Sequence, residues 1–223
     1  MSLLSWLRSR KSTSTQERRW RGPARKSAAF PPRLEALEDR CLPSFSSPTS
    51  YAVGANPQAV VTADLNGDGR LDLVTANWSA TGVSVLLAKN NGFAPAQNYA
   101  VGAAAAVAVG DINGDGKPDI VTGGGGVLLG NGNGTFRIGP SYAGGLGSYV
   151  ALADVNGDGK LDLITASYFG KTIHVLLGNG DGTFRAASTL TTSDYIVAVT
   201  MGNFNGKPDI VVGTNSEIGR AHV

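Results

Sequence analysis

The chain has 223 residues, of which 42% are hydrophobic and 16% are charged, and it contains 31 glycines. Low charge and a glycine share about twice the usual one argue against long solvated helices and coiled coils, and they favour short strands joined by many turns. A single cysteine, Cys41, excludes a disulfide framework, and no apolar run approaches the ~18 residues of a membrane-spanning helix, so no membrane span is expected.

The net charge of +2 conceals two parts of opposite sign. Residues 1–42 hold ten of the nineteen Lys and Arg residues and four acids, whereas the remainder holds nine bases and thirteen acids. Apart from Glu217, every acid of the second part is Asp, and ten of these acids fall into four short clusters. Clustered Asp without Glu indicates turns and ligands for hard cations rather than a solvated helical surface.

Residues 1–50 are rich in Arg, Ser and Pro and predict a basic, mostly disordered leader or targeting segment. The apolar stretch 3–7 is too short for a standard secretory signal. The segment Arg33–Arg40 resembles the LEPR-XLL motif of large bacterial surface proteins, with Ala36 in place of the motif's Pro. This resemblance implies export, and a plain basic tail is the alternative. Aromatic residues are not spaced among the bases as an RNA surface requires, so no nucleic-acid partner is expected.

The rest of the chain repeats. Asp64, Asp111 and Asp154 each open a nine-residue Asp-rich loop, and a fourth copy, Asn203–Asp209, is two residues shorter. The first residues are separated by 47, 43 and 49 positions, and short runs rich in β-branched residues flank each loop. Four such predicted strands in each unit of ~45 residues are typical of a β-propeller blade.

We therefore predict an all-β fold, a partial β-propeller of about 3.5 four-stranded antiparallel blades, preceded by the disordered N-terminal segment. The blades are expected at residues 51–98, 99–141, 142–188 and 189–214, the last with two strands only. Because a ring needs 4–8 blades, the open edges of this array predict self-association. Residues 215–223 match a common sequencing adapter when back-translated. We expect them to be an artefactual tail and the true protein to continue with more blades.

The loops carry the strongest chemical signal. Positions 1, 3, 5 and 9 of each intact loop are Asp, Asn, Asp and Asp, positions 4 and 6 are Gly, and position 7 can add a backbone carbonyl. Oxygen ligands at this density suit Ca²⁺, whereas zinc would require His or Cys. The predicted metal ligands are Asp64, Asn66, Asp68, Arg70 and Asp72; Asp111, Asn113, Asp115, Lys117 and Asp119; and Asp154, Asn156, Asp158, Lys160 and Asp162.

The loops have two other possible interpretations. An EF-hand requires Glu at position 12 and a following helix, but position 12 is Thr75, Thr122 or Thr165 and a strand-like run follows. An Asx-rich turn that binds no metal is the structural alternative. Three Ca²⁺ sites are expected. The fourth loop, Asn203–Asp209, lacks the position-5 Asp and is predicted to be empty or very weak.

Glycine-rich turns complete the repeat pattern at Gly130–Phe136 and Gly178–Phe184. With the Asp loops, they make residues 51–214 resemble FG-GAP or VCBS repeats, the blades of integrin-α-like β-propellers. The resemblance implies that Ca²⁺ is structural, that the protein is extracellular or on the cell surface, and that it serves in adhesion or ligand binding. A protein or a glycan would be the ligand.

No Ser-His-Asp set or Cys-His pair is evident, so an enzyme is not expected. His174 is interpreted as a packed or surface residue of a strand. One alternative function is carbohydrate binding by a lectin-like propeller, with aromatic candidates Trp78, Tyr142, Tyr168 and Phe169. Another is the non-catalytic propeller of a larger secreted hydrolase or lyase.

Overall fold

The computed structural model of the protein describes residues 48–79, 82–143, 147–203 and 208–222. The chain divides into two units, residues 1–47 and residues 48–223, and the described residues all belong to the second. The predicted leader and the LEPR-XLL-like motif therefore lie outside the described residues. Within the described part of the chain every regular element is a β-strand, and no helix there is long and apolar enough to cross a membrane.

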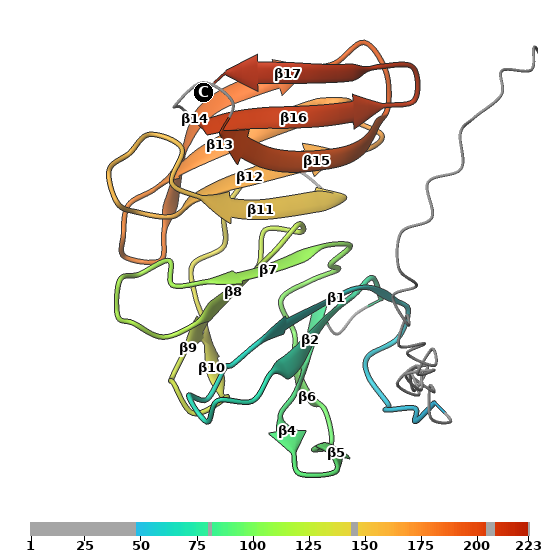
Figure 1. Ribbon diagram of the computed structural model, residues 1–223, viewed down its shortest axis with the longest axis vertical. Helices are drawn as coiled ribbons and strands as arrows, with labels where there is room; N and C mark the ends of the chain where they lie inside the picture. Colours follow the sequence, from blue (N-terminus) through green and yellow to red (C-terminus); the bar gives the residue numbers. More distant parts are fainter. Residues whose placement is uncertain (1–47, 80–81, 144–146, 204–207, 223) are drawn as a thin grey trace, which may run out of the picture. The chain divides into compact units, whose positions relative to one another are not determined.

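The described strands form four antiparallel blades (Figure 1). Blade one contains β1 (Pro57–Ala63), β2 (Asp72–Asn77), β3 (Gly82–Leu86) and β6 (Gln97–Tyr99), with a small hairpin of β4 (Ala88–Lys89) and β5 (Gly92–Phe93). Blade two contains β7 (Val107–Gly110), β8 (Asp119–Thr122), β9 (Val127–Gly130) and β10 (Phe136–Ile138). Blade three contains β11 (Tyr149–Ala153), β12 (Asp162–Ser167), β13 (Thr172–Gly178) and β14 (Phe184–Thr191). Blade four contains β15 (Ile196–Asn203), β16 (Pro208–Thr214) and β17 (Ile218–His222).

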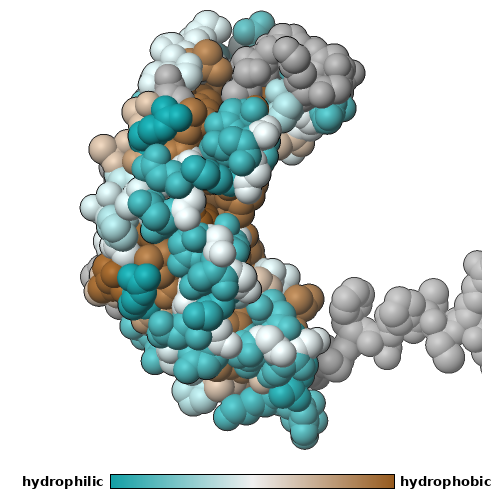
Figure 2. Space-filling model, turned by 90° about the vertical axis from the view of Figure 1, so that its left-hand side faces the viewer, coloured by the Kyte–Doolittle hydropathy of each residue, from teal (hydrophilic) through white to brown (hydrophobic). Residues whose placement is uncertain are grey.

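Each blade is a meander in which consecutive main strands pair. The first strands of successive blades contact one another, β1 with β7, β7 with β11 and β11 with β15, so the blades follow one another as in a propeller (Figure 1). The prediction of an all-β partial propeller is confirmed. On the side of the unit that Figure 2 shows, hydrophilic residues cover most of the visible surface and hydrophobic residues appear between them.

The hydrophobic core lies between the blades rather than within one of them. Side chains alternate across a strand, so neighbouring residues face opposite blades. In β8, Ile120 belongs to the cluster shared with blade one, whereas Val121 belongs to the cluster shared with blade three. In β12, Leu163 faces blade two and Ile164 faces blade four. This double burial explains why the second strands are nearly continuous apolar runs.

Three boundaries differ from the sequence-based expectation. β6 runs to Tyr99, one residue past the expected end of blade one at 98. β14 runs to Thr191, three residues past the expected end of blade three at 188. The last blade was expected to stop after two strands near Thr214, but residues Ile218–His222 form a third strand that pairs antiparallel with β16. A short turn explains this pairing: the amide of Thr214 donates to the carbonyl of Glu217 at 2.8 Å.

Candidate metal centre

The three intact Asp loops occupy equivalent places in the fold. Each loop connects the first strand of a blade to the second, at residues 64–71, 111–118 and 154–161. The position-9 Asp is in each case the first residue of the second strand. The loops are therefore hairpin connections at one end of three successive blades, as the repeat spacing predicts.

The Asp at position 1 organises the turn. The carboxylate of Asp64 accepts hydrogen bonds from the amides of Gly67 at 2.8 Å, Asp68 at 3.2 Å and Gly69 at 2.8 Å. Asp111 and Asp154 accept the same three bonds in their own loops. The two glycines have φ values of 73° and 81°, in the left-handed region that glycine adopts without strain. The turn thus forms around one carboxylate.

In the third loop these hydrogen bonds affect the pKa of the acid at position 1, Asp154. Hydrogen bonds from backbone amides stabilise an ionised carboxylate, and the amide of Gly159 contributes most at Asp154. They hold the pKa of the Asp154 carboxyl below its ordinary value. The loop therefore keeps its first acid charged even without any cation nearby.

Positions 3 and 5 lie on the exposed side of the turn. Asn66 Oδ1 accepts a bond from the amide of Asp68 at 3.0 Å, and Asp68 Oδ1 accepts one from the amide of Arg70 at 2.9 Å. The amide of Arg70, followed by its guanidinium, holds the pKa of Asp68 below its ordinary value. The guanidinium lies 3.1 Å from Asp68, and in the second loop Lys117 lies 3.7 Å from Asp115. These ion pairs are exposed and stabilise the loop little.

The Asp at position 9 has a different environment. Asp162 is fully buried, and its two oxygens accept bonds from the amides of Val155 at 3.0 Å and Gly178 at 2.8 Å. Asp72 and Asp119 make the same pair of contacts in their blades. The carboxylate thus joins the loop to the chain that leaves the third strand. Burial raises the pKa of the Asp119 carboxyl, against the lowering effect of its amide partners.

Position 2 was not singled out from the sequence, yet it anchors each loop. Leu65, Ile112 and Val155 are buried, and each belongs to one of the three clusters between the blades. An apolar residue between two polar ones was the available signal. The loop is therefore held from two sides, by an apolar side chain at position 2 and by a buried carboxylate at position 9.

The side chain at position 7 connects each loop to another turn of its blade. The guanidinium of Arg70 donates to Asn90 Oδ1 at 2.8 Å, which links the first loop to the turn after β4. Lys117 and Lys160 extend over Gly132 and Gly180, where a Cβ would lie 3.1 Å and 3.2 Å from the lysine chain. Each loop therefore contacts another turn of its own blade.

The donor chemistry of the loops fits a hard cation. Each loop offers three carboxylates, an amide oxygen and a backbone carbonyl, and an ionised carboxylate has about four acceptor sites, of which the amides use two or three. Ca²⁺ prefers this all-oxygen set and completes it with water. Among the described residues, however, no group of three or more His, Cys, Asp or Glu side chains converges to form a metal cluster. The fifteen ligands therefore stay a prediction.

The fourth loop differs, and most of it, residues 204–207, lies outside the described residues. Its Asp209 is fully buried and pairs with Gly202 across β15 and β16. That this loop is empty also stays a prediction.

The aromatic candidates from the sequence separate into two groups. Trp78, Tyr168 and Phe169 line one pocket, together with Tyr149, which the sequence did not single out. Tyr142 lies elsewhere: its hydroxyl donates to the carbonyl of Thr122 and its ring packs edge-on against Phe184. His174 is on β13, and its ring bonds Thr189 across the strand pair at 3.0 Å.

Comparison with solved structures shows similarity of fold. The crystal structure of BBS1N in complex with ARL6DN, soaked with mercury, is 14% identical with a TM-score of 0.52. The match covers 77% of this chain and 56% of that one, so this chain spans little more than half of its structural relative. The lead-soaked crystal of the same complex matches with 11% identity, a TM-score of 0.34, and coverage of 77% and 81%.

Comparison with sequences identifies the repeats. No curated protein matches the chain significantly. The model of the FG-GAP-like repeat matches residues 64–122 and 154–212, which together make up more than half of the chain. Both segments begin at the first Asp of an intact loop and end in the second strand of the following blade. The chain therefore belongs to the family of FG-GAP-like repeat proteins.

Proposed function

We propose that the chain is a non-catalytic, ligand-binding propeller of the extracellular space or the cell surface, and that its three intact Asp loops bind structural Ca²⁺. The observation that carries this proposal is the threefold recurrence of one loop geometry. A metal-free Asx turn does not require an exposed acid at position 5 in addition to the acid that forms the turn. All three loops have one, at Asp68, Asp115 and Asp158.

Each position of the loop would have a different role in binding the ion. The position-1 carboxylate shapes the turn through its three amide bonds, and the position-9 carboxylate fixes the turn to the blade. Positions 3 and 5 lie on the outer side, where an ion could approach from solvent. Bound Ca²⁺ would supply positive charge that offsets the mutual repulsion of the acids. Extracellular calcium modules bind with Kd values of ~10⁻⁴–10⁻³ M, which suits such small, exposed loops.

Calcium titration of the full chain tests this proposal. Three sites are expected by isothermal titration calorimetry. Calcium at about twenty times Kd should stabilise the fold by about 2 kcal/mol per site, seen as a higher melting temperature than in EGTA. Asp68→Ala, Asp115→Ala and Asp158→Ala should each remove one site. Asp181→Ala is the matched control, because Asp181 is an exposed acid on a glycine-rich turn outside the loops.

The proposal fails if millimolar Ca²⁺ gives neither saturable heat nor a change in melting temperature relative to EGTA. It also fails if Asp181→Ala lowers the number of sites as much as the three loop variants do. Magnesium, which demands a nearly ideal octahedral site, should bind more weakly than calcium.

A further inference from the structure

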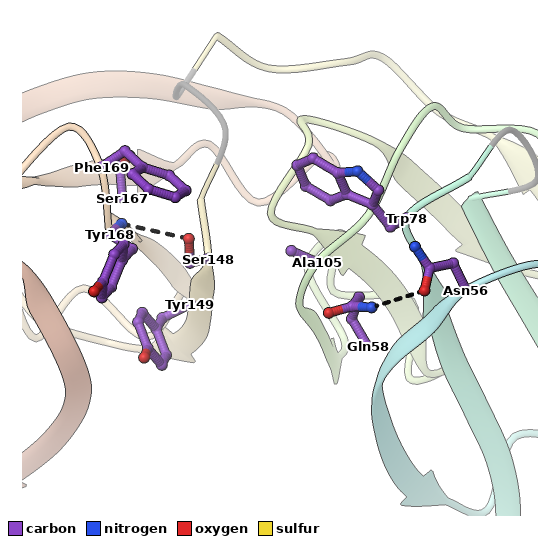
Figure 3. A pocket seen from close by; sticks show the side chains of 9 residues that line it. All are labelled: Asn56, Gln58, Trp78, Ala105, Ser148, Tyr149, Ser167, Tyr168 and Phe169. Atoms are coloured by element: carbon purple, nitrogen blue, oxygen red, sulfur yellow. Dashed lines mark hydrogen bonds between the residues drawn. The ribbon is translucent and has the colours of Figure 1, made fainter.

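A pocket of about 740 Å³ opens between blades one, two and three. Figure 3 shows two groups of side chains that face each other across this space, with Trp78 on one side and Phe169 on the other. The volume is within the usual range for small-ligand sites, about 300–1,000 Å³. The lining residues are Asn56, Gln58, Trp78, Ala105, Ser148, Tyr149, Ser167, Tyr168 and Phe169.

The repeat pattern explains why the space exists. Trp78 follows the second strand of blade one, and Tyr168 and Phe169 follow the second strand of blade three. The equivalent turn of blade two is Gly123–Gly126, which has no side chains. Neighbouring backbone also excludes side chains there, because a Cβ on Gly124 would lie 2.1 Å from the carbonyl oxygen of Ala103. The aromatic residues of blades one and three thus form walls on either side of a turn of blade two that has no side chains.

The aromatic side chains of the two walls are exposed, and ring contacts hold those of blade three in place. Phe169 is 84% exposed and Trp78 is 44% exposed, although such side chains are usually mostly buried. Tyr168 stacks on Tyr195 with ring centroids 5.1 Å apart, and the ring of Phe169 lies edge-on to Tyr168 at 5.0 Å. The ammonium of Lys171 lies 4.7 Å from the centre of the Tyr195 ring. The rings of Tyr168 and Phe169 therefore form a supported platform on one side of the pocket.

The polar part of the lining is neutral. It consists of the amides of Asn56 and Gln58, which bond each other at 3.3 Å, and the hydroxyls of Ser148 and Ser167. None of the lining residues is charged. Asn56 also has a φ of 60°, an uncommon backbone conformation that recurs at ligand sites. Amides and hydroxyls both donate and accept hydrogen bonds, so they match a ligand that does the same.

We propose that this pocket binds a neutral carbohydrate, with a pyranose ring against the aromatic walls and its hydroxyls on the amides and serines. The C–H face of a sugar ring is apolar, whereas its hydroxyls donate and accept. A nucleic-acid strand would need a positively charged groove along its backbone, whereas no residue that lines this pocket is charged. A proline-rich peptide offers the pocket carbonyl acceptors only, since its prolines lack N–H groups. This inference rests on the proposed ligand-binding role and adds the class of ligand.

Fluorescence of Trp78 provides the test. Trp6→Phe/Trp20→Phe in the full chain leaves Trp78 as the only tryptophan. Cellotetraose, xylotetraose, mannotetraose and chitotetraose are titrated to about 10 mM, which detects Kd values in the millimolar range, with decaproline as the competing class. At least one tetrasaccharide should change the emission saturably. Phe169→Ala should weaken that binding about tenfold, because it removes one exposed ring of the platform.

The control is Tyr51→Ala, because Tyr51 is a 36% exposed aromatic residue that does not line this pocket. It should change the affinity less than about twofold. Absence of saturation with all four sugars overturns the inference, as does saturation by decaproline only or sugar binding that Phe169→Ala leaves unchanged. The calcium titration is scored separately, so calcium binding without sugar binding refutes this inference and leaves the proposed function standing.

Discussion

Replacing the buried Asp162 by Ala should destabilise the fold even in the complete absence of calcium. In the native chain the two carboxylate oxygens accept the amides of Val155 and Gly178 in a buried environment. The Ala variant leaves both amides without these acceptors in the same place. The carboxylate thus has a fastening role that does not depend on any cation.

The expected cost follows from the two lost bonds. A buried donor left without its partner costs about 1–3 kcal/mol, so two donors cost about 2–6 kcal/mol. For a domain of this size 1 kcal/mol shifts the melting temperature by about 2–4 °C, and a fall of about 10 °C is expected. Asp162→Asn keeps one acceptor oxygen and should lose about half as much. Asp158→Ala changes an exposed residue of the same loop and should shift the melting temperature little in EGTA.

Thermal unfolding of the full chain in EGTA, followed by circular dichroism, gives the comparison. Adding calcium should then distinguish the two positions. Asp158→Ala should lose the rise in melting temperature that one bound calcium provides, while its melting temperature in EGTA stays near that of the parent chain. The reasoning is refuted if Asp162→Ala and Asp158→Ala melt within about 2 °C of each other in EGTA, since that difference corresponds to less than one lost bond.

Two further outcomes are expected. Gly130→Ala should lower the free energy of unfolding by about 1–3 kcal/mol, because its Cβ would lie 2.1 Å from the Pro118 carbonyl oxygen. Gly219→Ala has open space around it and should be nearly neutral. Urea unfolding compares the two variants, and equal effects would contradict the close approach of the backbone at Gly130. Burial raises the pKa of Tyr142 above its ordinary value, so the stability that it contributes is present below pH ~10 and is lost as the pH rises beyond that value. Titration at 295 nm should show a late-ionising tyrosine that disappears in Tyr142→Phe, and an unchanged titration in that variant would contradict the assignment.

The strands and the loops were predictable because both follow from local pattern. Short β-branched runs between Gly, Asn and Asp locate strands such as β2 and β12, and the nine-residue repeat sets the blade spacing. The glycines at positions 4 and 6 indicate the left-handed turn that the structure contains. Such features depend on residues close in sequence, where steric limits on the backbone decide the conformation.

The other features depend on residues far apart in sequence. The sequence predicts Asp162 as a metal ligand, like the other acids of its loop. Only the structure shows that it is buried and that it bonds to the amide of Gly178, which lies 16 residues further along the chain. Tyr149 was not singled out, because nothing around it in sequence indicates that it lies near Phe169. Pairing of β17 with β16 likewise arises from the turn at Thr214, which is weakly marked in the sequence.

The buried position-9 carboxylates bond only to amides of their own blades. A duplicated blade would therefore bring this fastening with it. Its contacts with neighbouring blades would be the apolar ones that Leu65 and Ile112 make in the clusters between blades, together with a few hydrogen bonds such as the one from the Gly182 amide to the Ile112 carbonyl. This self-sufficiency offers a physical route by which such arrays can grow or shrink by whole units during evolution. It also identifies the engineerable segment, which runs from the first strand of one blade to the last strand of the same blade.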